Sequence, residues 1–417
     1  MKSSGRVSGR TSRRGFLRGA AGVAMAAPAL ARAGQSGART ATGRVLLCVG
    51  TYSNPQGPER SKGRGQGIYV FEMNPANGAL TQREVIPSDA NPAWLALHPT
   101  GKYLYSANEV ANFGGANSGS VSAYTVDRTT GHLTLLNTVS SEGAGPAHMS
   151  VHPSGKFALV ANYAGGTEAV LPIHTNGELG PATDVIHNQG TLGPEQPHSA
   201  PVGSYAFSGH DKPHAHMIQA DASGRYVFAA DLGLDHILIW KIDLESGKLT
   251  PNDPPFVAVP PGDGPRHFVF HPNGRWFYSL QEEGSTLLAF DYDSQQGRLR
   301  EKQTLSSLPK GFVGTNFTSE VRISPDGKFL YAANRLHDSV AWFSISAAGM
   351  LTFAGEEWTR GDYPRSFTID PTGSFLYCCN QRGDAITTFR VNRSTGALSF
   401  TGHYTPIGTP ANVVFLP

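Results

Sequence analysis

Three arginines, two glutamates and four histidines stand at equivalent places in a repeated sequence pattern, where their side chains suit acid–base chemistry on an anion. Each lies near the start of a short apolar segment or at the polar end of the next: His148, His214, His216, Arg266, His267, Glu282, Glu320, Arg335 and Arg365. Arginine binds carboxylates and phosphates through paired N–H groups. Carboxylate and imidazole groups transfer protons. If the fold brings them together, they form a site for an anionic small molecule.

The same side chains also have structural interpretations. Arginine and glutamate at strand ends commonly form ion pairs between neighbouring units. His98, His152 and His271 each precede a proline and are expected to bond within turns. His214 and His216 are two residues apart and would share a face of a strand, a spacing that could serve a metal. No third ligand follows at a fixed spacing, so we predict neither a metal nor a cofactor.

Seven copies of one pattern organise the chain. Each begins with a proline or its equivalent, continues with alternating residues and a turn, and ends in an aromatic-rich segment with a polar last residue. The copies start at Pro92, Pro146, Ala215, Pro265, Thr318, Pro364 and Pro410, which are 54, 69, 50, 53, 46 and 46 residues apart. Repeats of about this length are typical of solenoids and propellers.

The residues between these starts favour strands over helices. A turn such as His-Pro-Thr-Gly at 98–101 precedes the β-forming run 103–105, and a third strand is expected at 121–126. A polar turn and a fourth strand follow. Four antiparallel strands per copy make a propeller blade, and the 3.6-residue period of helical repeats is absent. The sequence therefore predicts an all-β, seven-bladed β-propeller.

The two ends of the chain predict how the ring closes. The seventh copy supplies only a first strand, at 412–416, so its second and third strands are expected at 45–49 and 68–73. The N-terminal strand would then pair with the C-terminal strand, which removes exposed sheet edges. The propeller domain is predicted to span residues 34–417.

Residues 1–33 are predicted to be a leader. The segment 12–18, Ser-Arg-Arg-Gly-Phe-Leu-Arg, matches a twin-arginine export signal. Residues 19–30 form an apolar run that is too short and weak to span a bilayer comfortably. We therefore expect export by the twin-arginine route, a periplasmic or secreted protein, and no transmembrane segment in the mature chain.

Composition excludes some functions. The 417 residues carry a net charge of +2, with 16% charged residues and 49 glycines, which is typical of a turn-rich β-protein. No basic stripe with interleaved aromatics is present, so nucleic-acid binding is not expected. Cys48, Cys378 and Cys379 lack metal-ligand spacing and are expected to be buried, unpaired thiols. The oligomeric state is left open.

Several motifs resemble those of the seven-bladed propeller lactonases, over nearly the whole chain after the leader. They are Pro-His-Ala-His at 213–216, Gly-Pro-Arg-His at 264–267, His-Pro-Asn-Gly at 271–274, Ser-Glu-Val-Arg at 319–322 and Ala-Asn-Arg at 333–335. This family includes a bacterial 6-phosphogluconolactonase and a fungal 3-carboxymuconate lactonizing enzyme. The resemblance implies hydrolysis or formation of a lactone without a metal.

The resemblance also suggests roles. The positions that match the active site of the muconate branch are His216, Arg266, Glu282 and Arg335. His214 and Glu320 fall in motifs of the bacterial members of the family. From their equivalent positions at the inner strand ends as well, the residues assigned to substrate binding are His148, His214, His267, Glu320 and Arg365. We expect Glu282 or Glu320 to be the general base and His216 to shuttle a proton. Arg266 and Arg335 would hold the anionic group of the substrate and stabilise the oxyanion that forms during the reaction.

Three functions fit these observations. The first is hydrolysis of a sugar lactone or a related anionic cyclic ester, as in 6-phosphogluconolactonase. The second is lactonisation of an unsaturated dicarboxylate, a polyanion that the arginines would suit equally. The third is a binding propeller of the cell envelope without enzymatic activity. The export signal departs from the cytosolic sugar metabolism of the family, and the long segment 188–212 is expected beside the site.

Overall fold

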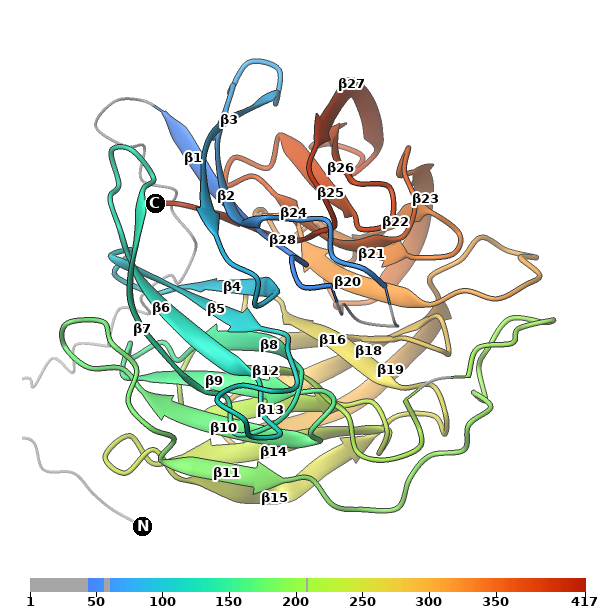
Figure 1. Cartoon of the computed structure of the whole chain (residues 1–417). Helices are drawn as coiled ribbons and strands as arrows, with labels where there is room; N and C mark the ends of the chain where they lie inside the picture. The colour runs from blue at the N-terminus through green and yellow to red at the C-terminus, as the bar shows by residue number, and fades with distance from the viewer. Residues whose placement is uncertain (1–43, 56–60, 208) are drawn as a thin grey trace, which may run out of the picture. The chain divides into compact units, whose positions relative to one another are not determined.

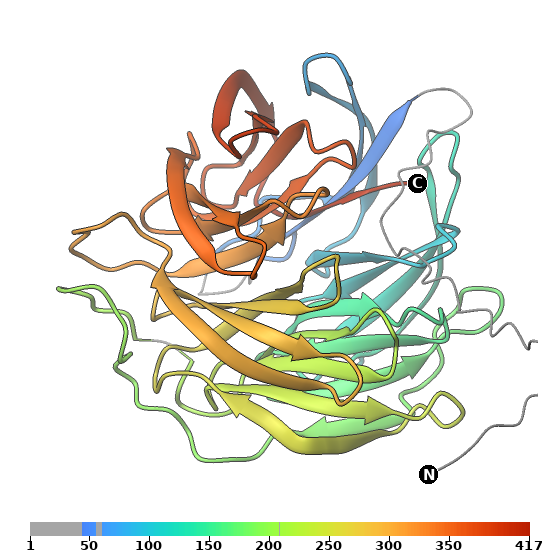
Figure 2. The same cartoon turned by 180° about the vertical axis from the view of Figure 1, so that it is seen from behind.

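The computed structural model describes residues 44–55, 61–207 and 209–417, and the predicted leader lies outside these residues. They form seven four-stranded antiparallel sheets. The sheets follow one another around a ring (Figure 1), and the view from behind shows the same succession (Figure 2). In these ranges there is no helix with the length and apolar character needed to cross a bilayer. The predicted all-β, seven-bladed propeller is confirmed.

The first strand of every blade lies nearest the centre, because these strands contact one another in turn around the ring. They are β4 (Pro92–Leu97), β8 (Pro146–Val151), β12 (Ala215–Ala220), β16 (Pro265–Phe270), β20 (Thr318–Ile323), β24 (Pro364–Ile369) and β28 (Pro410–Phe415). Each begins at the first residue of a predicted copy. The repeat in the sequence therefore marks the innermost strands.

The other three strands of each blade lie progressively outward. The second strands are β1 (Val45–Thr51), β5 (Tyr103–Asn108), β9 (Phe157–Asn162), β13 (Tyr226–Asp231), β17 (Trp276–Gln281), β21 (Phe329–Asn334) and β25 (Phe375–Asn380). The third strands are β2 (Gly67–Met73), β6 (Ser120–Val126), β10 (Thr167–Pro172), β14 (His236–Ile242), β18 (Thr286–Asp293), β22 (Ser339–Ile345) and β26 (Ala385–Val391). The outer strands are β3 (Leu80–Pro87), β7 (Leu133–Ser140), β11 (Asp184–His187), β15 (Leu249–Ala258), β19 (Arg298–Ser306), β23 (Leu351–Trp358) and β27 (Leu398–Pro406).

Ring closure occurs as predicted. The closing sheet has the order β28-β1-β2-β3, so the last strand of the chain pairs with the first. Leu47 lies opposite Phe415, and Val49 lies opposite Val413. The strand β28 begins at Pro410, two residues before the predicted start, because the seventh copy pairs from its first residue like the other six.

The hydrophobic core lies between neighbouring blades. Phe228, Phe268, Phe277 and Phe290, for example, are buried together between the β12–β15 and β16–β19 blades. The adjacent thiols of β25 face opposite sides, as strand alternation requires, and they enter two different core clusters. All three cysteines are buried and unpaired, as predicted.

Repeated hydrogen bonds connect each blade to the next. Tyr278 donates to the carbonyl of Gly349, and Tyr331 donates to that of Gly396, both at 2.9 Å. His152 contacts Ser154 in its own turn, as predicted for the histidines before a turn proline. It also contacts the carbonyl of Gly224 in the next blade, a link that the sequence did not predict.

Candidate active site

Every innermost strand begins with a β-bulge or a similar shift of register, and these irregularities bring side chains to the centre. A bulge leaves one residue without a partner in the ladder and re-aims its side chain. In six blades the residue after the first strand position lines one central cavity: Ala93, Ala147, His216, Arg266, Arg365 and Ala411. Tyr52, Trp94 and His267 complete the lining. Six of the seven innermost strands thus contribute a side chain to the lining of the central cavity.

The central cavity is narrow. Its volume of about 10 Å³ is close to the space that a single buried water needs. Two arginines, two histidines and one tyrosine face it, while the alanines keep it open. The arrangement provides a position for one small polar molecule among groups that carry positive charge or can accept a proton.

A buried network of two arginines and one glutamate lies next to this cavity. Glu282 follows β17 directly, and its carboxylate oxygens lie 2.7 Å from Nε of Arg266 and 2.7 Å from a terminal nitrogen of Arg335. Arg266 also donates to the carbonyl of Ser319 in the next blade. Three of the four residues predicted to be catalytic therefore contact one another, and His216 shares the cavity with Arg266. The ion-pair interpretation is correct as well, because the contact between Glu282 and Arg335 joins two blades, whereas Arg266 and Glu282 belong to one blade.

Aromatic side chains hold the second guanidinium group in place. Arg335 lies 5.5 Å from the ring centre of Phe317 and 5.2 Å from that of Tyr363, both cation–π contacts. The side chain of Arg335 is 2% exposed. Such a fixed, buried guanidinium is ready to bind an anion without first losing conformational freedom.

The charges of this network shift the pKa of the neighbouring groups. Burial, followed by the charge of Arg335, lowers the pKa of Arg266 to about 10, so Arg266 remains protonated at neutral pH. Burial holds the pKa of His216 well below its ordinary value, and Arg266 adds to this shift. His216 is therefore a neutral imidazole at neutral pH, able to accept a proton.

The guanidinium of Arg365 is held by Glu109 and by Tyr52, a residue that was not predicted to belong to the site. The hydroxyl of Tyr52 donates to Glu109 at 2.7 Å, and the Arg365 guanidinium lies 3.7 Å from the same carboxylate. The guanidinium also lies 5.1 Å from the ring centre of Tyr52. The signal was present, because Tyr52 follows β1, the second strand of the closing blade, as Glu282 follows β17.

The predicted histidines gather around Trp94. His148 lies 4.5 Å and His267 5.2 Å from the Trp94 ring centre, and His267 lies 5.1 Å from His216. His267 also contacts Glu320, with 3.2 Å between Nδ1 and the nearer carboxylate oxygen. Two of the residues assigned to substrate binding, His267 and Arg365, line the cavity, whereas His148 and Glu320 are not among its described lining residues.

His214 has a different environment. Its Nδ1 contacts the carbonyl of Tyr163 at 2.9 Å, and its Nε2 contacts Asp211 at 2.8 Å. The backbone N–H of His214 donates to Asp231, a buried carboxylate at the end of β13. Both ring nitrogens are thus engaged in holding the loop before β12. Within residues 44–55, 61–207 and 209–417, no group of three or more His, Cys, Asp or Glu side chains is arranged to hold a metal ion.

The described part of the long segment, residues 188–207 and 209–212, crosses the loops of the next blades. The backbone N–H of Ser199 donates to Asp263, and that of Tyr205 donates to the Thr315 hydroxyl. In Figure 1 this segment runs from β11 along the loops that precede β16 and β20. These contacts place Ser199 and Tyr205 against the loops that lead into β16 and β20, and the position of the segment beside the site stays a prediction.

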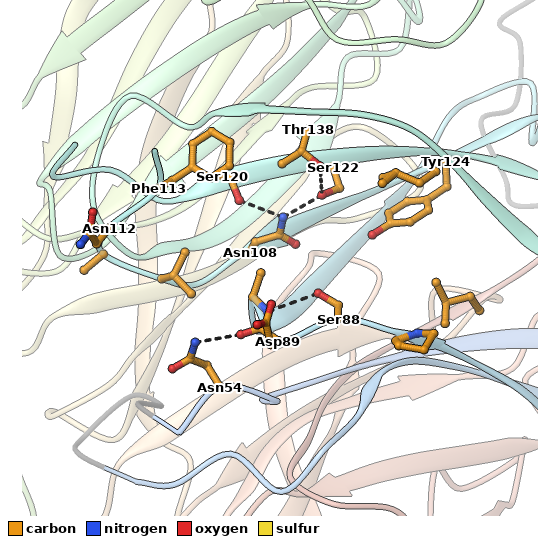
Figure 3. Close-up of a pocket in the computed structure, with 16 residues that line it drawn as sticks. Asn54, Ser88, Asp89, Asn108, Asn112, Phe113, Ser120, Ser122, Tyr124 and Thr138 are labelled. Atoms are coloured by element: carbon orange, nitrogen blue, oxygen red, sulfur yellow. Dashed lines mark hydrogen bonds between the residues drawn. The ribbon is translucent and has the colours of Figure 1, made fainter. Parts of the chain in front are cut away.

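A larger pocket of about 500 Å³ lies away from this network. Figure 3 shows it between the loops of the closing blade and strands β5–β7. Among the described residues that line it, Asp89 is the one acidic side chain, and there is no lysine, arginine or histidine. Asn108 donates to both Ser120 and Ser122, so its amide is already occupied. The larger pocket therefore lacks the charged groups that the sequence predicts for the site, whereas the central cavity has them.

Comparison with known proteins agrees with this arrangement. The family model described as "Lactonase, 7-bladed beta-propeller" matches residues 46–415. A 6-phosphogluconolactonase of Bacillus subtilis is 33% identical over 370 residues, which cover 88% of this chain and 97% of that protein. A 6-phosphogluconolactonase of Formosa agariphila is 33% identical over 338 residues, covering 80% of this chain and 91% of that protein.

A solved structure of a lactonase is also similar to this chain. The periplasmic gluconolactonase of Pseudomonas aeruginosa superimposes with a TM-score of 0.78 and 30% sequence identity. The match covers 90% of this chain and 99% of that protein. Fold, motifs and near-complete coverage agree with the resemblance found in the sequence. The chain belongs to the seven-bladed β-propeller lactonase family.

Proposed function

We propose that this protein hydrolyses an anionic sugar lactone or a related cyclic ester at the central site. The observation that carries the proposal is the buried network of Arg266, Glu282 and Arg335 beside a cavity lined by neutral histidines. The relatives support a sugar lactone as the substrate, because they are named 6-phosphogluconolactonase and gluconolactonase, and the phosphate of the first supports an anionic one.

The arginines suit the charge that hydrolysis develops. When water attacks the lactone carbonyl, negative charge forms on the carbonyl oxygen, and fixed N–H donors stabilise it. Arg266 and Arg335 are buried and held in place before substrate arrives. Arg365 reaches the cavity from another blade and adds positive charge for a phosphate or carboxylate.

Glu282 fits best as the residue that orients both guanidinium groups. Each of its carboxylate oxygens already lies 2.7 Å from an arginine. His216 would pass a proton to the leaving alkoxide, as proposed from the sequence. In this scheme the chain's own charges stabilise the oxyanion, so the reaction we propose is independent of a metal.

The proposal is tested by assaying the protein without its leader on a panel of lactones. We expect hydrolysis of at least one sugar lactone above its spontaneous rate, with higher kcat/KM for a phosphorylated lactone than for its neutral counterpart. Arg365→Gln should reduce that preference, because one positive charge at the cavity is lost. Initial rates of acid release, corrected for spontaneous opening, measure both effects.

Two other results would redirect the assignment. Loss of the ultraviolet absorbance of a muconate, with every lactone left intact, would indicate lactonisation. No reaction with any compound of the panel would favour the non-enzymatic binding propeller.

We also propose export by the twin-arginine route to the periplasm or beyond. The support is the motif at 12–18 and the periplasmic location in the name of the Pseudomonas relative. Replacing Arg13 and Arg14 together by lysine should keep the full-length protein inside the cell, because that route depends on the arginine pair. Fractionation followed by immunoblotting measures this, and unchanged export of the double variant would refute the route.

A further inference from the structure

We propose that His267, oriented by Glu320, is the group that takes the proton from the attacking water. The assignment rests on the proposed lactone hydrolysis and replaces Glu282 and Glu320 as candidates for the base. It makes His267 a catalytic residue and Glu320 a positioning residue. The geometry of the pair carries the argument.

Glu320 lies in the irregular start of β20 and is buried together with His267, whereas Arg322 is partly exposed. Its carboxylate is 3.2 Å from His267 Nδ1 and 3.3 Å from Nε of Arg322. The backbone N–H of Val321 donates to the same carboxylate oxygen that faces His267, at 3.1 Å. Burial opposes ionisation of Glu320, but Arg322 and His267 outweigh it and lower its pKa. Glu320 is therefore ionised and can only accept hydrogen bonds.

An ionised Glu320 determines which nitrogen of His267 carries the proton. Because the carboxylate only accepts, Nδ1 of His267 must be the donor. In the neutral ring the lone pair then lies on Nε2. Holding the tautomer through a carboxylate is how a histidine is prepared to act as a base.

The free nitrogen of His267 is buried and lies beside the cavity. Nε2 has no hydrogen-bond partner, although its side chain is only 2% exposed. A buried polar atom without a partner is costly unless a ligand or water completes it. His267 lines the cavity that has room for about one water. A water there could donate to Nε2 and lie beside the guanidinium of Arg266.

The charge state of His267 is compatible with this role. Burial lowers its pKa to about 4, with Glu320 opposing the shift and Arg266 adding to it. The ring is therefore neutral at pH 7, with its lone pair available. The titratable and charged groups that face it from neighbouring strands are His148, His216, Arg266, Glu320 and Arg322. An anionic substrate would offset the arginine charges and raise the basicity of His267 when it binds.

Other candidate bases are less well placed. Glu282 has an arginine at each oxygen. His148 accepts a long contact of 3.4 Å from the backbone N–H of Ile218 at Nδ1, which leaves its proton on Nε2. His216 also has a buried nitrogen without a partner, but no described contact joins it to a carboxylate. His216 therefore suits the later transfer of a proton to the leaving oxygen.

The proposed step balances. The water oxygen forms a bond to the lactone carbonyl carbon while one of its protons moves to Nε2 of His267. The carbonyl π electrons move to oxygen, where Arg266 or Arg335 stabilises the charge. Collapse of this intermediate breaks the ring C–O bond, and the leaving alkoxide takes a proton from His216. The proton that His267 took from the water replaces it, since the two rings lie 5.1 Å apart, so both imidazoles end neutral. The product is the open hydroxy acid.

The kinetic test uses His267→Asn, whose amide nitrogen can replace Nδ1 as the donor to Glu320 but which has nothing in place of Nε2. We expect kcat to fall by about 10²–10⁴-fold with KM little changed, the range that a general base contributes. His271→Asn is the matched control, because His271 is buried near the other end of the same strand and contacts the carbonyl of Gly327. It should retain the wild-type kcat.

The positioning role of Glu320 has its own readout. In the wild type, kcat/KM should fall on acidification through about pH 4, because protonated His267 has no lone pair. The acidic fall of kcat itself should occur at higher pH than that of kcat/KM, because the bound anionic substrate raises the pKa of His267. Glu320→Gln should move the acidic fall of both kcat and kcat/KM to lower pH and should reduce kcat. The reason is that it removes the carboxylate that raises the pKa of His267. An unmoved profile would show that Glu320 has only a structural role.

A second measurement is independent of activity. In protein labelled with ¹⁵N at histidine, the ring of His267 should show a protonated Nδ1 and an unprotonated Nε2 at pH 7, with His267→Asn providing the resonance assignment. The opposite tautomer, or an unchanged kcat in His267→Asn, would overturn the inference while lactone hydrolysis stands. A wild type inert on every lactone would overturn the proposed function and this assignment with it.

Discussion

Arg266→Lys is expected to lower kcat/KM for lactone hydrolysis by about 10²–10³-fold, the loss that follows removal of one oxyanion donor. Lysine keeps the positive charge but loses the planar fork of the guanidinium group. In the native chain that fork contacts Glu282 through Nε and the Ser319 carbonyl through a terminal nitrogen. A single ammonium group cannot maintain both contacts and still face the cavity.

Steady-state kinetics with the best lactone of the panel measures this effect, and thermal unfolding shows whether the variant remains folded. Arg275→Lys is the matched control, since Arg275 lies in the same blade, is exposed and rests on the Trp276 ring. We expect the control to keep its wild-type kcat/KM. Equal rates for Arg266→Lys and the wild type would show that charge alone suffices at this position, or that Arg266 has no part in the reaction.

Glu282→Gln is expected to reduce both stability and activity. The substitution leaves Arg266 and Arg335 buried side by side without the carboxylate that each contacts at 2.7 Å. Removing one partner of a buried ion pair costs about 3–5 kcal/mol, because the remaining charge is uncompensated. The free energy of unfolding should fall by about this amount, and hydrolysis should be lost as the guanidinium groups move apart.

Denaturant unfolding of the wild type and the variant measures the change in stability. Added phosphate should stabilise Glu282→Gln more than the wild type, because an anion can take the place of the missing carboxylate and binding to the folded state raises its stability. Glu301→Gln, at an exposed position of β19, serves as the control and should change stability by less than about 0.5 kcal/mol. A Glu282→Gln protein as stable as this control would mean that the network is not fully desolvated.

The two predictions separate the roles of neighbouring residues. Arg266→Lys removes hydrogen-bond donors but keeps the positive charge, so its main effect should be on kcat/KM. The second changes the charge balance, so its effect should appear in stability before any substrate is added. A site that only joined blades would show the second effect without the first.

Much of the fold could be predicted because its signals are local. The turn motifs and the polar ends of the second strands recur with each blade, so each predicted copy starts at the first residue of an innermost strand. The bounds of the seventh strand, expected at 412–416, were two residues late at the start. Ring closure followed from an incomplete seventh copy. Strand alternation correctly separated Cys378 from Cys379, because neighbouring side chains of a strand point to opposite faces.

Comparing equivalent positions of the repeat identified the candidate residues. It did not identify which of them contact one another. Sequence spacing does not show that Glu282 lies between Arg266 and Arg335, which come from different blades. It does not show the bulge that directs His216 to the cavity, because alternation fails where a residue is left unpaired. Tyr52 was missed because its blade is assembled from both ends of the chain.

The sequence by itself determined the seven-bladed ring, its closure, and which side chains stand at the inner strand ends, because periodicity and turn chemistry act over a few residues. Only the tertiary structure decided how these side chains meet. The contact between His267 and Glu320 joins two blades across 53 positions of the chain, and it defines the tautomer of the histidine. Charge, burial and hydrogen bonding at the centre depend on distances between blades, which a sequence pattern does not contain.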